Sequence, residues 1–194
     1  MLKYIKWIVI VTIINLCSSI GFGYLIDKYK PSLFEDGFGD GTAKIEKETI
    51  KQLWFPAFVV FAATGEEVAF RFFPLALALF SCSFFFNKKL NGYVEMSNGK
   101  KMVMILFLYL YAIPISIVFG LVHGNYVNIL FQGVNGLIWS TLVISVINNY
   151  HKRPESLYED FIETSMKGLR IGVVLTSVSH TLFNLTIMYA WAYS

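Results

Sequence analysis

Three ionisable residues stand close together inside an apolar stretch of this sequence. Residues 64–71 read TGEEVAFR, and Glu66, Glu67 and Arg71 are surrounded by phenylalanine, alanine, valine and leucine. An ionised side chain at the centre of a membrane costs about 2.5 to 3.5 kcal/mol, so these groups need partners. Glu67 and Arg71 are four residues apart and share a helix face, which predicts a charge-assisted pair. Glu66 is turned about 100° away on the same helix, so its carboxylate is left for another role.

Two histidines lie in other apolar segments and could act together with Glu66. His123 lies in SIVFGLVHGNY, four residues after Phe119, and His180 lies in SVSHTLFNL, four residues before Asn184. Residues four apart lie along one helix face. If the three faces converge, a carboxylate, two imidazoles and an amide surround one wet pocket in the membrane. Such a set can activate a water molecule, bind a metal such as zinc, or relay protons.

The composition is that of a membrane protein, which supplies the helices that must position these groups. The 194 residues are 56% hydrophobic and 15% charged, and the mean hydropathy is +0.57. The segment from Met102 to Tyr150 contains no Lys, Arg, Asp or Glu. One helix needs about 20 residues to cross the hydrocarbon core, so this segment predicts two crossings, with the break at Gly124-Asn125.

Five apolar segments are expected to cross the membrane and to form an all-α polytopic helical bundle around an intramembrane polar site. They are residues 7–26, 53–86, the two halves of 102–150, and 169–192. The stretch 53–86 would be about 51 Å long as one helix, which is too long for an upright crossing. It is therefore either steeply tilted or broken near Thr64-Gly65, with Pro74 adding a kink, and a break would give six segments.

The polar segments suggest an orientation. Residues 27–52 form a polar loop that ends in a short polar helix around Lys44 to Lys51, and another polar loop runs from 151 to about Gly168. Basic residues are richest at the amino terminus and in the loops 87–101 and 151–170, which predicts a cytoplasmic amino terminus. The first apolar run is longer than the core of a usual signal peptide and lacks an A-x-A exit, so a retained anchor is expected. We therefore treat residues 1–194 as one integral membrane domain.

Some classes of function and site are excluded by composition. The net charge is only +3, and the basic residues flank apolar runs instead of alternating with aromatic residues, so no nucleic-acid partner is predicted. Cys17 and Cys82 both lie in apolar segments, which leaves neither a disulfide framework nor a CxxC metal site. The lipid bilayer is the partner that the composition implies.

Three short motifs together resemble a known family. EEVAFR at 66–71 is similar to an EExxxR motif, FGLVH at 119–123 to FxxxH, and HTLFN at 180–184 to HxxxN. Their order resembles that of the CPBP family, which contains the CAAX prenyl endopeptidases and bacterial proteins linked to bacteriocin processing and self-immunity. The resemblance covers about residues 60–190, with the Gly-rich stretch FQGVNG between the second and third motifs. Two departures are the long polar insert at 151–167 and Phe72, where many members have a glycine.

The resemblance implies an intramembrane endopeptidase of the glutamic type in a prokaryotic plasma membrane. Its substrate would be a membrane-associated or lipidated peptide or protein. The resemblance makes Glu66 the general base, with His123 helping to hold and activate the water. His180 and Asn184 would stabilise the oxyanion.

The remaining motif residues have supporting roles by the same resemblance. Glu67 and Arg71 would be the structural pair that fixes the helix start, and Arg71 could also meet a substrate carboxylate. Phe119 lies four residues before His123 on the same helix face, so it is expected to pack beneath His123.

Three alternatives stay open at this stage. Glu66, His123 and His180 could bind zinc, but a metal-free site is favoured because the ligands come from three separate helices and no HExxH spacing is present. The chain could also be a non-catalytic membrane scaffold or bacteriocin immunity protein that keeps the fold. An ion or proton carrier is disfavoured because the sequence shows five spans and no inverted repeat.

Overall fold

The computed structural model describes residues 2–29, 47–86, 97–124, 126–153 and 160–193, and all secondary structure in these ranges is helical. The helices are α1 (Leu2–Tyr29), α3 (Lys47–Ile50), α4 (Phe55–Glu67), the π-helix η1 (Val68–Phe72), α5 (Phe73–Phe86), α6 (Asn98–Val122), the π-helix η2 (Ile129–Gly133), α7 (Val134–Tyr150) and α8 (Phe161–Ala192).

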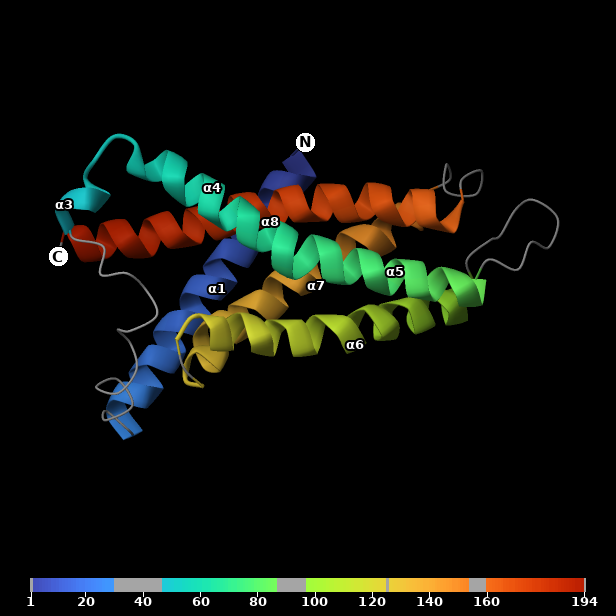
Figure 1. Cartoon of the computed structure of the whole chain (residues 1–194), viewed down its shortest axis with the longest axis horizontal. Coiled ribbons are helices and arrows are strands. Elements are labelled where there is room, and N and C mark those ends of the chain that lie inside the picture. Colours follow the sequence, from blue (N-terminus) through green and yellow to red (C-terminus); the bar gives the residue numbers. More distant parts are fainter. Residues whose placement is uncertain (1, 30–46, 87–96, 125, 154–159, 194) are drawn as a thin grey trace.

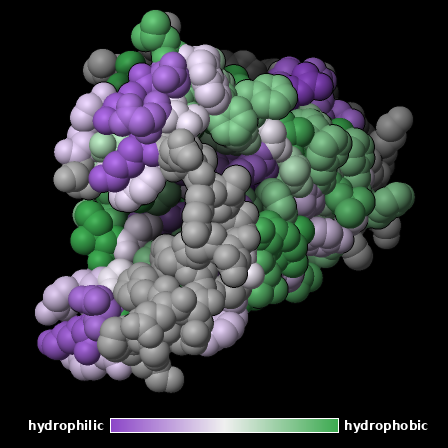
Figure 2. All heavy atoms as spheres, turned by 60° about the vertical axis from the view of Figure 1, so that its left-hand side comes forward, coloured by the Kyte–Doolittle hydropathy of each residue, from purple (hydrophilic) through white to green (hydrophobic). Residues whose placement is uncertain are grey.

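Five helices in the described ranges are long and apolar enough to cross a membrane. They cover Tyr4–Tyr29, Phe55–Phe84, Asn98–Val122, Ile129–Tyr150 and Phe161–Ala192. Their outward side chains are apolar as well, since Ile20 is 70% exposed, Phe61 79% and Phe84 87%. Figure 2 shows hydrophobic residues over much of the flank and hydrophilic residues gathered in separate patches. The chain is an integral membrane protein, and the predicted all-α polytopic bundle is confirmed.

Within the long stretch 53–86, residues 55–86 form one continuous helix with a π-helical segment in its middle. α4 passes through η1 into α5 without a break at Thr64-Gly65, so the alternative of six segments is wrong. A Cβ atom added at Gly65 would meet nothing within 4 Å, so this glycine marks no turn or close contact. The π-helical segment ends just before Phe73-Pro74. Pro74 has no N–H group to donate to the preceding turn, and a π-helical segment is one way in which a helix accommodates such a disturbance.

The helices pack around α7 and α8. In Figure 1, α4 and α5 run along the length of the molecule, α6 returns antiparallel beside α5, and α1 crosses the bundle obliquely. α7 contacts α1, α6 and α8, while α8 also contacts α4 and α5. One apolar cluster at this centre includes Leu79, Leu108 and Ile147.

The contact between α7 and α8 depends on small residues. A Cβ atom at Gly168 would lie 2.7 Å from the Cα atom of Ile147, and one at Gly172 would lie 3.0 Å from the Cα atom of Val143. The small-xxx-small spacing of these glycines therefore lets two backbones approach closely, as is common in membrane bundles.

α1 is tied to the bundle by buried polar contacts. The Thr12 hydroxyl lies 2.9 Å from the Ser179 hydroxyl of α8, and the Asn135 amide of α7 donates to the Ser19 hydroxyl at 3.0 Å. Hydrogen bonds between helices contribute to association in a membrane, where apolar contact alone distinguishes poorly between lipid and protein.

The loops differ from their predicted limits in two places. α8 begins at Phe161 instead of near Gly168, because Asp160 caps it by accepting a hydrogen bond from the Ile162 N–H at 3.4 Å. An ion pair between Glu163 and Lys167, 2.9 Å apart, supports its polar first turns. The predicted helix at 44–51 is the shorter α3, and residues 44–46 lie outside the described ranges.

Candidate functional site

Three helices bring a carboxylate and two imidazoles together. Glu66 is the penultimate residue of α4, His123 follows the end of α6, and His180 lies in α8. Oε1 of Glu66 lies 3.9 Å from Nε2 of His123, and Oε2 of Glu66 lies 3.6 Å from Nε2 of His180. The convergence predicted from the sequence is present for these three residues.

His123 is held by the end of its helix. Its Nδ1 atom lies 2.7 Å from the carbonyl oxygen of Phe119. A carbonyl can only accept, so Nδ1 carries the hydrogen, and Nε2 of the neutral ring presents a lone pair to Glu66.

The chain turns at Gly124, just after the end of α6. Gly124 has φ of 134°, a backbone conformation that favours glycine. The Asn128 amide donates to the carbonyl of His123 at 2.9 Å and fixes the turn. The predicted break at Gly124-Asn125 is confirmed at Gly124, while Asn125 lies outside the described residues.

His180 is held by the other glutamate of the motif. Its Nδ1 atom lies 3.0 Å from Oε1 of Glu67, which also lies 3.2 Å from Nη1 of Arg71. The predicted Glu67–Arg71 pair is therefore present, and both side chains are almost fully buried. Beside the arginine, Glu67 is an acceptor, so Nδ1 of His180 donates and its Nε2 faces Glu66. Glu67 thus positions a histidine of the site in addition to bracing its helix.

Aromatic rings form the floor beneath these groups. The Trp139 ring stacks on the His180 ring with centroids 4.0 Å apart and an angle of 26° between the planes. Phe119 packs edge-on against His123 at 4.5 Å, as predicted. The Arg71 guanidinium carbon lies 4.2 Å from the centre of the Phe119 ring and 5.4 Å from a ring of Trp139. These π faces offset part of the cost of burying the cation.

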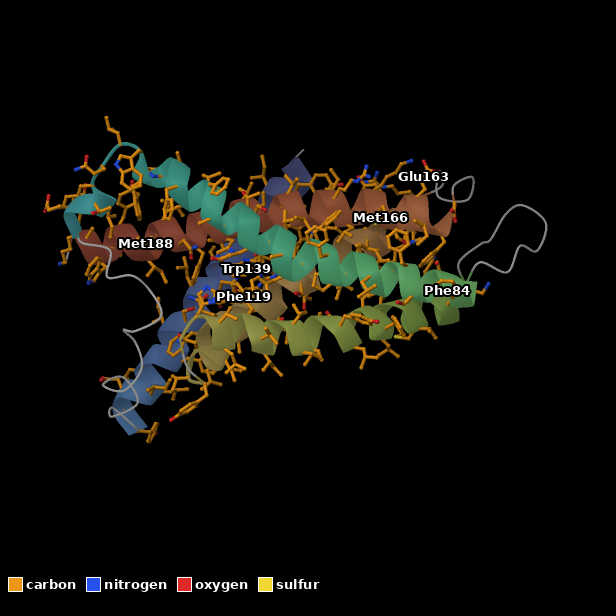
Figure 3. The ribbon with its side chains drawn as sticks, viewed as in Figure 1. Phe84, Phe119, Trp139, Glu163, Met166 and Met188 are labelled. Atoms are coloured by element: carbon orange, nitrogen blue, oxygen red, sulfur yellow. The ribbon has the colours of Figure 1, made fainter. Side chains whose placement is uncertain are left out.

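Figure 3 places Phe119 and Trp139 beside each other at the middle of the bundle, far from Phe84 and Glu163 near one end. Trp139 is not among the site residues predicted from the sequence. A tryptophan in an apolar helix gives no signal of whether it faces lipid or a histidine on another helix.

The Gly-rich stretch FQGVNG lets α7 approach the buried arginine. A Cβ atom at Gly136 would lie 2.7 Å from Nη2 of Arg71 and 3.1 Å from Cδ1 of Phe119. A Cβ atom at Gly133 would lie 3.0 Å from the Ser116 carbonyl oxygen. Gly136 therefore provides the space in which Arg71 lies, and Gly133 lets η2 approach the backbone of α6.

Asn184 lies one helical turn beyond His180 in α8 and is half-buried. Within the described part of the chain its amide makes no hydrogen bond, so its N–H groups remain free to donate. Its predicted role at the oxyanion stays a prediction.

The two glutamates differ sharply in their surroundings. The Glu67 side chain is 0% exposed, whereas that of Glu66 is 32% exposed and that of His123 is 20% exposed. Glu66 therefore faces the accessible side of the site. When both rings are neutral, the Glu66 carboxylate and the two Nε2 atoms are all acceptors. A water molecule between them can donate to two of these acceptors.

The same donor atoms, two imidazole nitrogens and a carboxylate, are of the chemical type that zinc prefers. Among the described residues, however, no three or more His, Cys, Asp and Glu side chains are grouped so that they could hold a metal ion. Zinc binding by Glu66, His123 and His180 therefore stays an alternative prediction from the sequence.

Comparison of the chain with protein-family models, with curated proteins and with solved structures finds no match. The class that the fold and the site define is an all-α polytopic membrane protein with a carboxylate–histidine site inside its bundle.

Proposed function

We propose that this protein is an intramembrane endopeptidase that hydrolyses a peptide bond in a membrane-associated or lipidated peptide or protein. The observation that carries the proposal is the convergence of the half-exposed Glu66 carboxylate with the Nε2 atoms of His123 and His180, at 3.9 Å and 3.6 Å. Each histidine is fixed through its other ring nitrogen, so the Nε2 atoms of both rings face the Glu66 carboxylate.

In the proposed reaction, water lies between Glu66 and His123. Glu66 takes a proton from this water as its oxygen attacks the scissile carbonyl carbon, and His123 accepts a hydrogen bond that orients the nucleophile. The proton then passes from Glu66 to the leaving amine as the carbon–nitrogen bond breaks. These steps consume only water and the peptide bond, and they return Glu66 to its ionised form.

The oxyanion of the tetrahedral intermediate would be stabilised by His180 and Asn184. For this step His180 must carry a proton on Nε2 as well as on Nδ1, so that Nε2 donates to the oxyanion while the Glu67 carboxylate accepts from Nδ1. Asn184 donates from its amide one helical turn further along. Glu67 and Arg71 do not touch the substrate in this scheme; they hold His180 and α4 in place.

The test is cleavage of a mixed library of membrane-tethered and lipidated peptides by purified protein in detergent. Wild type, Glu66→Gln and the matched control Glu163→Gln are compared, each with and without a strong chelator. Glu163 is an exposed glutamate near one end of the bundle, away from the site, so its variant should cut like the wild type.

Loss of cleavage in Glu66→Gln with no effect of the chelator is the expected result. Loss of wild-type cleavage with chelator and recovery with zinc would assign the site to a metallopeptidase. Equal cleavage by wild type and Glu66→Gln would remove Glu66 from the mechanism. No cleavage of any library member would favour a non-catalytic scaffold or immunity protein.

A further inference from the structure

A second polar hollow lies outside the carboxylate–histidine site, between the first turns of α1 and the last turns of α7. Its volume is 210 Å³, below the range of about 300 to 1,000 Å³ typical of drug-sized ligands. The hollow, which we call the α1–α7 pocket, is lined by Tyr4, Trp7, Leu142, Ser145, Val146, Asn149, Tyr150, Lys152 and Arg153.

Two basic residues line the α1–α7 pocket. They are Lys152 and Arg153, and none of the described residues that line it is acidic. Lys152 is exposed, and its ammonium group has no ion pair or hydrogen bond within the described ranges. Two cations around a small hollow favour an anionic ligand.

The polar groups of the pocket are already oriented. Arg153 donates from Nη2 to the Tyr4 hydroxyl at 2.9 Å, and its guanidinium carbon lies 3.7 Å from the centre of the Tyr150 ring. Because the Tyr4 oxygen accepts this bond, its own O–H hydrogen is available to donate to a ligand. The planar fork of an arginine suits the oxygens of a phosphate.

The position of the pocket indicates which kind of molecule carries the anionic group. The apolar span of α1 begins at Tyr4, and the span of η2 and α7 ends at Tyr150, so both reach the membrane surface at the pocket. Tyrosine and tryptophan are enriched at this level of a bilayer, where lipid head groups lie. Leu142 and Val146 add apolar surface to the same hollow, on the bilayer side of the cations.

We propose that the α1–α7 pocket binds the phosphate head group of an anionic phospholipid. Lys152 and Arg153 meet the phosphate charge, the Tyr4 hydroxyl donates to a phosphate oxygen, and the start of the lipid glycerol lies against Leu142 and Val146. Bound lipid would fix α1 to α7 at this end. The pocket is independent of the proposed peptidase activity.

Native mass spectrometry of the whole chain in detergent tests the proposal with three probes. They are phosphatidylglycerol, phosphatidylcholine with the same acyl chains, and soluble glycerol phosphate. One nearby cation is worth about fivefold in binding to an anionic lipid surface. Wild type should therefore bind phosphatidylglycerol at least about fivefold more tightly than phosphatidylcholine.

Lys152→Gln should weaken phosphatidylglycerol binding about fivefold because it removes one nearby cation. Tyr4→Phe should weaken it about fivefold because it removes one donated hydrogen bond. The matched control Lys28→Gln removes a cation from the opposite end of α1 and should leave binding unchanged. If Lys28→Gln and Lys152→Gln weaken phosphatidylglycerol binding equally, the preference comes from general surface charge. That result would overturn the α1–α7 pocket as a specific binding site. Equal binding of both lipids would overturn the preference for an anion, and binding of glycerol phosphate as tight as the lipid would overturn the lipid assignment.

Discussion

The Nδ1 atom of His180 lies 3.0 Å from Oε1 of Glu67, and this contact joins α8 to α4 inside the bundle. The adjacent glutamate, Glu66, faces the opposite nitrogen of the same ring at 3.6 Å. The two neighbouring carboxylates therefore face the two nitrogens of one imidazole ring. Glu67 is buried with Arg71, whereas Glu66 is partly accessible. Their substitutions should have different consequences.

Replacing Glu67 with glutamine should lower the free energy of unfolding by about 3 to 5 kcal/mol, because Arg71 would be left as an unpaired buried charge. Glu66→Gln should cost less than about 1 kcal/mol, since Glu66 is 32% exposed and lies beyond hydrogen-bond distance of either histidine. Denaturant or thermal unfolding in detergent measures both values. The double variant Glu67→Gln with Arg71→Met should regain part of the loss; a double variant no more stable than Glu67→Gln alone would contradict the pairing.

Trp139 should act as a positioning residue through its stacking on His180. Trp139→Leu removes the flat face against the imidazole. Because small misplacements of catalytic groups lower rates strongly, we expect a loss of about 10-fold in activity. Cleavage kinetics should show a lower kcat with little change in KM, because the ring does not touch substrate in the proposed scheme. Trp139→Phe should restore part of kcat. A rise in KM alone would place Trp139 at the substrate instead.

Gly136→Ala should destabilise the protein by about 1 to 3 kcal/mol, because its Cβ atom would lie 2.7 Å from Nη2 of the buried Arg71. Gly65→Ala is the matched control in another helix, where a Cβ atom meets nothing within 4 Å. That change should be neutral or stabilising by up to about 1 kcal/mol, since alanine loses less conformational freedom in a helix. Melting temperatures in one detergent compare the pair, and equal shifts in both would contradict the crowding at Arg71.

Stability should fall at acidic pH because of His151, which lies just after the span that ends at Tyr150. Burial, together with the positive charge of Lys101, lowers the pKa of His151 to about 4. The unfolded chain, with an ordinary histidine pKa near 6.5, binds the proton first. The stabilisation is therefore complete above about pH 6.5 and is lost as pH falls toward 4, by up to about 3 kcal/mol.

Unfolding measured between pH 7 and pH 4 tests this dependence, with His151→Gln as the comparison. The variant loses the contact between Nε2 of His151 and the Ser165 hydroxyl, which is 2.8 Å in the wild type. It should be less stable at pH 7 and should depend less steeply on pH. The same slope in both proteins would assign the acid sensitivity to another group.

The amino-acid sequence by itself determined the class of fold. Apolar runs long enough to cross a bilayer need internally bonded backbones, so composition and run length suffice to predict a helical membrane bundle. Helical spacing also predicted the Glu67–Arg71 pair and the packing of Phe119 on His123, because both lie within one turn of a single element. The end of α6 at Gly124 was predictable because glycine suits a backbone with positive φ.

Tertiary structure decided what depends on contacts between helices. The stretch 53–86 is too long for one upright crossing, and its sequence left both a tilted helix and a broken one open. Residues 55–86 continue as one helix through η1, with α8 packed on α4 and both α6 and α8 packed on α5. The contacts of Glu67 with His180 and of Trp139 with His180 join residues from different helices, and no spacing along the chain encodes them. The sequence could supply the chemical groups, but only the packing of α4, α6, α7 and α8 sets which nitrogen each carboxylate faces.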